Sequence, residues 1–300
     1  MTEERKQEIL EIIRNTNRRP AQTGKPLYPE EIMAYPNLCE EMESISRTVD
    51  GFSYRMDILR AKNRGENCPL FINIHGGGFI GPHRENDTYF SAYMADQIHG
   101  ITVDLDYTLS DAAPYPVALH QCMDALDYVA EHANTWGASA KDISVGGYSA
   151  GGALTAAMGI CCAERGGFVP KFQILCYPPL EYRIPDQYKI DAYDRQIGME
   201  RCKAFADLYF DDKKENFEDI HNSPLYAPRE ILAKQPKTLI LSAGLCNFRY
   251  EDEDYAICLA DAGAEVILKR FPEASHGFIP HFMDGWKEAA DLMVREILEK

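Results

Sequence analysis

The sequence lacks the long apolar runs and the leader that would place the protein in or across a membrane. No stretch approaches the roughly 20 continuous apolar residues that a membrane span needs. The first residues, MTEERKQEILEIIRN, are charged from the third position onward and contain no apolar core of a signal peptide. We therefore expect a cytoplasmic protein with no membrane partner.

Basic residues are too few to balance the acidic ones. The chain has 31 Lys and Arg against 47 Asp and Glu, which gives a formal net charge of −16 at pH 7. Such a chain is repelled by duplex nucleic acid and by anionic membrane surfaces, so neither is expected as a main partner.

Cysteine pairs with the spacing of metal ligands are also missing. None of the nine cysteines belongs to a CxxC or CxxH pair, which argues against a structural zinc site. An odd number of cysteines in a leaderless chain predicts reduced, mostly buried thiols. There is no internal repeat, and 300 residues of which 45% are apolar predict one domain, residues 1–300, with a full core.

From residue 69 onward, strand patterns alternate with helix patterns. Strands are predicted near 69–76, 101–107, 143–148, 171–177, 237–243 and 265–271, and helices near 86–99, 116–133, 150–164, 199–210, 250–262 and 280–298. Upstream, residues 3–14 predict an amphipathic helix, residues 15–44 are irregular and rich in proline, and Asp50-Gly51 predicts a hairpin. This order predicts an α/β fold with a mostly parallel sheet covered on both faces, and ligands at the carboxyl ends of its strands.

One of the strand ends carries a candidate nucleophile. The sequence Gly147-Tyr148-Ser149-Ala150-Gly151 has the pattern G-x-S-x-G and lies between a predicted strand and a predicted helix. A sharp strand-to-helix turn holds such a serine in strained backbone geometry, and the flanking glycines let neighbouring chains pass closely. A packing turn of small residues is the alternative, but this context favours Ser149 as a nucleophile.

A second strand end carries a glycine-rich loop, His75-Gly76-Gly77-Gly78-Phe79. Consecutive glycines let backbone N–H groups turn toward one point, as acyl transfer requires when a carbonyl oxygen becomes an oxyanion. An ordinary flexible loop is the alternative. A phosphate-binding loop is less well supported, because no Lys-Ser or Lys-Thr follows.

His276 is the candidate general base for Ser149. It lies in a loop after a late strand and before the final predicted helix, and the order Ser-then-His is the one used by many serine hydrolases. The other seven histidines have ordinary interpretations on helices, in polar loops, in the glycine-rich loop or, for His281, at the start of a helix.

Together these motifs resemble the hormone-sensitive-lipase-like branch of the α/β-hydrolases. The resemblance covers roughly residues 65–300 and rests on HGGG, Asp106-Tyr107, Pro114-Tyr115-Pro116, GYSAGG and the late SHGF. It implies an eight-stranded sheet, and a cap built from residues of about 1–45 and 178–236. It also implies hydrolysis of small carboxylic esters without a cofactor, and it allows a homodimer through edge strands.

The resemblance also assigns roles to individual residues. It implies that Ser149 is the nucleophile, that His276 is the base, and that the amides of Gly77, Gly78 and Ala150 hold the oxyanion. Tyr148 replaces the aspartate that usually precedes the serine.

The larger departure from the family concerns the triad acid. Where the family has an aspartate in a pattern like G-x-D-P-L-R-D-E, this chain reads GLCNFRYE, with Cys246 at the acid position. A thiol is a weak hydrogen-bonding group and is normally neutral near pH 7. Glu181, after the preceding strand, is a candidate acid. The other nearby candidates are uncharged or start a helix, where acids are favoured in any case: Asn247, Glu251, Asp252 and Asp254.

Three functions follow from these motifs. The first is a serine hydrolase that cleaves small carboxylic esters through an acyl-enzyme, weakened by the cysteine at the acid position. The second is a non-catalytic protein that binds a small ligand on the same scaffold, and the third is an amide or peptide hydrolase. The acidity of the 178–236 insertion argues against anionic substrates.

Overall fold

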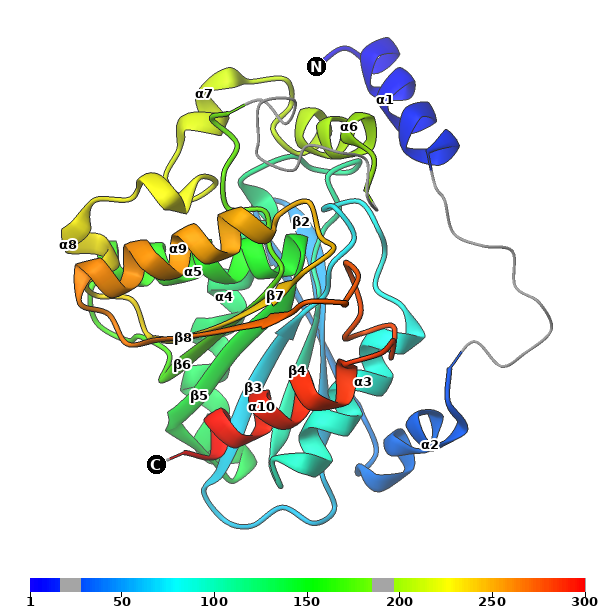
Figure 1. Cartoon of the computed structure of the whole chain (residues 1–300). Coiled ribbons are helices and arrows are strands. Elements are labelled where there is room, and N and C mark those ends of the chain that lie inside the picture. Colours follow the sequence, from blue (N-terminus) through cyan, green and yellow to red (C-terminus); the bar gives the residue numbers. More distant parts are fainter. Residues whose placement is uncertain (17–27, 185–196, 300) are drawn as a thin grey trace.

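The structure, a computed structural model, describes residues 1–16, 28–184 and 197–299 (Figure 1). The strands are β1 Glu43–Val49, β2 Phe52–Arg60, β3 Cys68–Ile74, β4 Ile101–Asp106, β5 Ala138–Tyr148, β6 Phe172–Cys176, β7 Lys237–Ala243 and β8 Val266–Phe271. The α-helices are α1 Glu3–Asn15, α2 Glu30–Met33, α3 Glu85–Gln97, α4 Val117–His132, α5 Ala150–Arg165, α6 Met199–Tyr209, α7 Lys214–Glu218, α8 Arg229–Leu232, α9 Arg249–Ala262 and α10 Trp286–Leu298. Short 3₁₀ turns are η1 Tyr35–Leu38, η2 Ala133–Trp136 and η4 Pro224–Tyr226.

The eight strands form one sheet in the order β1-β2-β4-β3-β5-β6-β7-β8. Only β2 runs antiparallel to its neighbours, and the other pairs are parallel. The predicted hairpin is present: Val49 pairs with Phe52 across Asp50 and Gly51, whose φ values of 52° and 83° suit a two-residue turn. The expected mostly parallel, eight-stranded α/β-hydrolase sheet is therefore confirmed.

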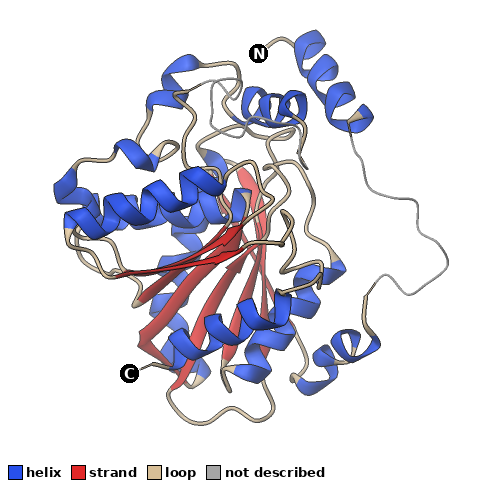
Figure 2. Cartoon of the chain, in the orientation of Figure 1, coloured by secondary structure: helices blue, strands red, loops and turns tan. Residues whose placement is uncertain are grey.

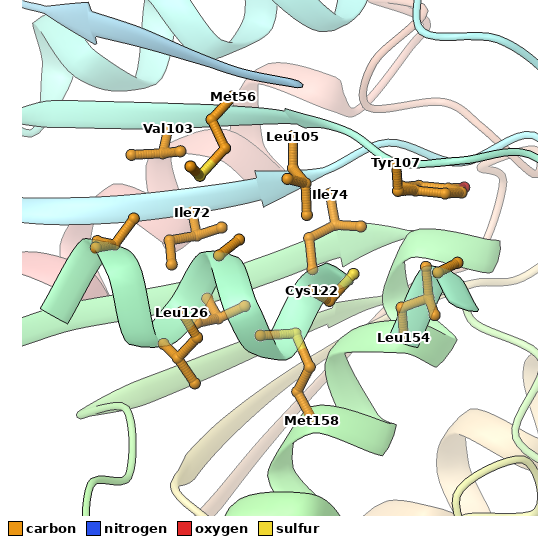
Figure 3. Close-up of a cluster of buried hydrophobic side chains, with 14 of the residues drawn as sticks. Met56, Ile72, Ile74, Val103, Leu105, Tyr107, Cys122, Leu126, Leu154 and Met158 are labelled. Atoms are coloured by element: carbon orange, nitrogen blue, oxygen red, sulfur yellow. The ribbon is translucent and has the colours of Figure 1, made fainter. Parts of the chain in front are cut away.

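Helices cover both faces of the sheet, as the alternating sequence predicted (Figure 2). On one face α4 and α5 pack on the central strands and α9 packs on β7 and β8, while α3 and α10 lie on the other face. Figure 3 shows strand side chains such as Ile72, Ile74 and Val103 meeting Leu126 of α4 and Met158 of α5. Every residue of β6 is buried, because that central strand is covered on both sides.

Two element boundaries differ from the sequence prediction. β5 begins at Ala138 rather than near 143, because its first residues pair with the start of β3 through an irregular register. α10 begins at Trp286 rather than near 280, and a series of turns fills the interval. His281, expected at a helix start, lies in these turns.

The N-terminal region divides between two places. α1 packs against α6 through Ile9, Ile13, Ala204 and Leu208, and both helices lie beyond the carboxyl ends of the strands (Figure 1). α2 and η1 instead pack against α3 on the side of the sheet. α8 likewise packs against α5 and α9. The two segments expected to form a cap thus supply α1 and α6 at the strand ends, and residues 17–27 and 185–196 of those segments lie outside the described residues.

Among the described residues, no helix combines the length and the apolar character needed to cross a bilayer.

Candidate active site

Ser149 occupies the sharp turn between β5 and α5. Its φ of 53° and ψ of −119° are rare for a non-glycine residue and cost about 1–3 kcal/mol, which the surrounding structure must hold in place. A side chain at Gly151 would overlap the carbonyl oxygen of Ile74 on the neighbouring strand β3, so a glycine is needed there. The expected strand–turn–helix arrangement therefore exists, and it projects the serine at the start of α5.

His276 reaches Ser149 from the turns that follow β8. Its Nε2 lies 2.9 Å from the Oγ of Ser149, although the two residues are 127 positions apart in sequence. Its Nδ1 lies 3.0 Å from the Sγ of Cys246 in the turn after β7. The edges and faces of Tyr177 and Phe248 pack around the imidazole, with ring centroids 5.0 and 5.7 Å away.

Burial determines the charge states of His276 and Cys246. Desolvation, together with a smaller effect of the charge of His281, lowers the pKa of His276 to about 3. Desolvation raises the pKa of the Cys246 thiol well above its usual value. The backbone N–H of Phe248 donates to Cys246 Sγ at 3.3 Å. At neutral pH the imidazole and the thiol are therefore both uncharged, whereas a triad carboxylate would stabilise a protonated imidazole.

The two glutamates near the site hold backbone amides. The carboxylate of Glu181 accepts the N–H groups of Arg183 and Ile184. The carboxylate of Glu251 accepts the N–H groups of Leu180 and Glu181, at 2.8 and 3.0 Å. The structure thus places Cys246 against Nδ1 of His276. The Glu181 carboxylate instead stabilises the backbone turn to which Glu181 itself belongs.

The glycine-rich loop faces Ser149 across a common cavity. Gly77 and Gly78 line this cavity together with Ser149 and His276. A Cβ at Gly78 would lie 2.5 Å from the ring of Phe205 on α6, and its φ of 63° also favours glycine. Ala150 is the first residue of α5, where backbone N–H groups have no partner within the helix.

The loop is held in place from behind by aromatic and hydroxyl contacts. The rings of His75 and Tyr107 stack with centroids 4.3 Å apart, and the Tyr107 hydroxyl donates to the carbonyl oxygen of His75 at 3.1 Å. The Ser110 hydroxyl donates to the carbonyl oxygen of Phe79 at 2.9 Å. These contacts fix the backbone on which the orientation of the Gly77 and Gly78 amides depends.

A buried ion pair lies next to the loop and was not found from the sequence. His83 Nε2 is 2.7 Å from Asp104 Oδ2, and Asn73 donates to the other oxygen of Asp104 at 3.1 Å. Burial opposes protonation of His83, but the negative charge of Asp104 dominates and raises the pKa of His83 to about 9. No sequence pattern indicates this pair, because His83 and Asp104 come together only when β4 packs behind the loop.

Two cavities open at Ser149. The larger, of about 390 Å³, lies between the glycine-rich loop, α1, α6 and the turn of His276. Its polar and charged lining includes Arg14, Arg84, Asp87, Arg201 and His281, none of which the sequence had indicated as site residues. The smaller, of about 30 Å³, is mostly apolar and is lined by Gly78, Ala150, Pro179, Phe205 and Phe248, among others.

No group of three or more His, Cys, Asp or Glu side chains in the described ranges has the geometry to hold a metal ion.

Comparisons with known proteins identify the family and the fold of the chain. A family profile described as the α/β hydrolase fold matches residues 71–280. Esterase LipI of Mycobacterium tuberculosis is 30% identical over 217 residues, which cover 71% of this chain and 66% of LipI. Hormone-sensitive lipase of Bos taurus is 29% identical over 120 residues, 40% of this chain and 16% of the lipase. The matched segments therefore span slightly less than two thirds of LipI and a small part of the lipase.

A crystal structure of carboxyl esterase 2 from the mycorrhizal fungus Tuber melanosporum superposes with a TM-score of 0.82. The superposition covers 97% of each chain at 21% sequence identity, and it shows that the two proteins share a fold.

Proposed function

The chain belongs to the α/β-hydrolase family, in its hormone-sensitive-lipase-like branch, and from this premise we propose that it is a serine carboxylesterase for small esters. The observation that carries the proposal is the hydrogen-bonded pair of Ser149 and His276, 2.9 Å apart, at the wall of a cavity shared with Gly77 and Gly78. Esterase relatives such as LipI support the same chemistry.

In the proposed reaction, Oγ of Ser149 attacks the ester carbonyl carbon while its proton passes to Nε2 of His276. The amides of Gly77, Gly78 and Ala150 donate to the oxyanion that forms. The bond from the carbonyl carbon to the alcohol oxygen then breaks, and Nε2 returns the proton to the departing alcohol. Water attacks the acyl-serine by the same route and releases the carboxylic acid.

Cys246 determines how efficient this reaction is. For Nε2 to accept the serine proton, Nδ1 must carry a hydrogen, and Cys246 Sγ, 3.0 Å away, is positioned to accept it. A neutral sulfur orients the ring but gives little electrostatic stabilisation to the imidazolium that forms. We propose a slow esterase whose catalysis rests mainly on the oxyanion-binding amides and on substrate positioning.

The cavities support a short acyl group. The 30 Å³ cavity beside Ser149 and Ala150 has room for roughly two water-sized groups, which suits an acetyl or propionyl chain. The larger cavity would then take the alcohol part of the ester. In this proposal α1 and α6 act as the cap, because they form the wall of the larger cavity opposite the strand ends.

The proposal is tested by labelling with a fluorophosphonate probe and by hydrolysis of p-nitrophenyl acetate. We expect the probe to modify Ser149, and we expect the Ser149→Ala variant to lose both labelling and turnover. Ser53→Ala, an exposed serine on β2, serves as the matched control and should behave as the unmodified protein. A folded protein whose Ser149 stays unlabelled, with no ester turnover, would point to the ligand-binding alternative. Faster cleavage of p-nitroanilides than of esters would instead indicate an amide hydrolase.

A further inference from the structure

Among the described residues, the charged lining of the larger cavity is opposite in sign to the charge of the protein. The chain as a whole carries −16, yet the described lining contributes three arginines, Arg14, Arg84 and Arg201, and one acid, Asp87. The three arginines come from α1, from the residue before α3, and from α6. Their convergence beside Ser149 is therefore a product of tertiary packing.

Two of these arginines differ from most others in the molecule. Arg5, Arg47, Arg55, Arg60, Arg64, Arg165, Arg270 and Arg295 each pair with a carboxylate. Within the described ranges, Arg14 and Arg84 have no carboxylate within ion-pair distance. Arg201 already donates to the carbonyl oxygen of Ile13 at 2.8 Å and lies over the ring of Phe205, so it serves as part of the wall.

The backbone around Arg84 is fixed, which gives its side chain a defined starting point at the cavity. The N–H of Arg84 donates to Asp87 Oδ2 at 2.9 Å, and the N–H of Asp87 donates to the carbonyl oxygen of Arg84 at 3.0 Å. The other carboxyl oxygen of Asp87 accepts from the amide of Asn86 at 3.2 Å. Both carboxyl oxygens of Asp87, the acid in the described part of the lining, thus already accept hydrogen bonds from neighbours.

Asp87 also contributes less than a full negative charge near neutral pH. Burial, reinforced by the nearby charge of Asp104, raises the pKa of Asp87 to about 7. Within the described lining, the positive charge of the guanidinium groups therefore exceeds the negative charge of Asp87.

We propose, resting on the esterase function above, that the larger cavity recognises an anionic carboxylate on the alcohol part of the ester, with Arg84 as its main partner and Arg14 as the second. The substrate class is a short-chain acyl ester of a hydroxy acid. A guanidinium forms two parallel hydrogen bonds with a carboxylate, which fixes the orientation of the ester as well as its affinity. This assignment is the opposite of the expectation, drawn from the acidity of the insertion, that anionic substrates are disfavoured.

The test compares two substrates that differ in charge. 4-Acetoxybenzoate carries a carboxylate on its alcohol part, and methyl 4-acetoxybenzoate carries a neutral ester in the same position. The quantity measured is the ratio of kcat/KM for the acid to kcat/KM for its methyl ester. Comparing this ratio between protein variants cancels the intrinsic reactivities of the two compounds.

We expect Arg84→Gln to lower this ratio about 10- to 100-fold, the range for loss of a charge-assisted hydrogen bond. Arg84→Lys should retain part of the preference, because it keeps the charge and loses the paired geometry. Arg295→Gln is the control for the change in net charge, since Arg295 lies on α10 and its side chain is 70% exposed. An unchanged ratio in Arg84→Gln, or an equal fall in Arg295→Gln, overturns the proposal.

Product binding separates this inference from the esterase proposal. In the Ser149→Ala variant, calorimetry compares the affinity for 4-hydroxybenzoate with that for its methyl ester. Tighter binding of the acid, lost on Arg84→Gln, supports the anionic site even if no ester is hydrolysed. Equal binding of the two compounds to Ser149→Ala, when the unmodified protein hydrolyses p-nitrophenyl acetate, refutes the anionic site and leaves the esterase function intact.

Discussion

Replacing Cys246 with aspartate tests the electrostatics of the proposed site directly. The new carboxylate would take the place of a sulfur that lies 3.0 Å from Nδ1 of His276. It would also take over the backbone N–H of Phe248, which now donates to the sulfur. With two donors available, the buried charge is paired, and we expect the variant to fold.

The size of the effect follows from the charge that develops on His276. Two unit charges about 4 Å apart interact by about 4 kcal/mol at an effective dielectric constant of 20. Because each 1.36 kcal/mol changes a rate tenfold, this corresponds to roughly a 10³-fold increase in kcat. The loss observed when a serine-hydrolase triad acid is neutralised, about 10⁴-fold, sets the upper end of the range.

The assay measures kcat and KM for p-nitrophenyl acetate with the unmodified protein and the Cys246→Asp and Cys246→Asn variants. Asparagine has nearly the shape of aspartate without its charge, so Cys246→Asn should stay within about tenfold of the unmodified protein. Adding Ser149→Ala to Cys246→Asp should abolish the gain. If Cys246→Asp folds and its kcat stays within a few-fold of the starting value, a charged partner for His276 is not what the site lacks.

Two further predictions concern the base and the acyl cavity. Because burial lowers the pKa of His276 to about 3, kcat/KM should stay nearly constant from pH 8 down to pH 5. In Cys246→Asp the carboxylate raises this pKa, so the loss of activity on acidification should begin at a higher pH than in the unmodified protein. Initial rates across pH, with circular dichroism at each point, check this, and a loss of activity centred near pH 6.5 in the unmodified protein contradicts it. Phe205→Ala removes a ring from the wall of the 30 Å³ cavity and makes room for a longer acyl chain. The ratio of kcat/KM for p-nitrophenyl butyrate to kcat/KM for p-nitrophenyl acetate should therefore rise about tenfold, because burying each of the two additional methylene groups contributes roughly 0.8 kcal/mol. Phe52→Ala, at an exposed ring on β2, is the control, and an unchanged preference in Phe205→Ala would remove that ring from the acyl site.

At position 246 this chain departs from the motif pattern of its family, because it has a cysteine where the pattern has an aspartate. The surrounding frame is kept: β7 ends at Ala243, the turn carries Cys246, and α9 begins at Arg249. The thiol of Cys246 lies against Nδ1 of His276 in this turn, at the position where the family pattern has an aspartate. We expect such a site to hydrolyse reactive esters slowly, and restoring one carboxylate is the smallest change expected to speed it.

Much of the fold was determined by patterns within short stretches of sequence. The buried run of β3, the alternation into β4 and the Asp50-Gly51 turn each depend on residues a few positions apart, so their secondary structure could be read locally. The same holds for the turn at Ser149, because the need for glycine at Gly151 arises from the close approach of a neighbouring strand and leaves a recognisable spacing.

Only the tertiary structure decided which side chains meet at the cavity. Glu181 and Cys246 were both candidates to face His276, and the choice depended on the path of two separate loops, one of which uses the Glu181 carboxylate to hold its own backbone. Arg14 and Arg84 are 70 residues apart and line the same cavity, which α1 closes by packing against α6, so no sequence spacing records their approach. Local backbone preferences act over a few residues, whereas the charge of a cavity is the sum of groups that packing alone brings together.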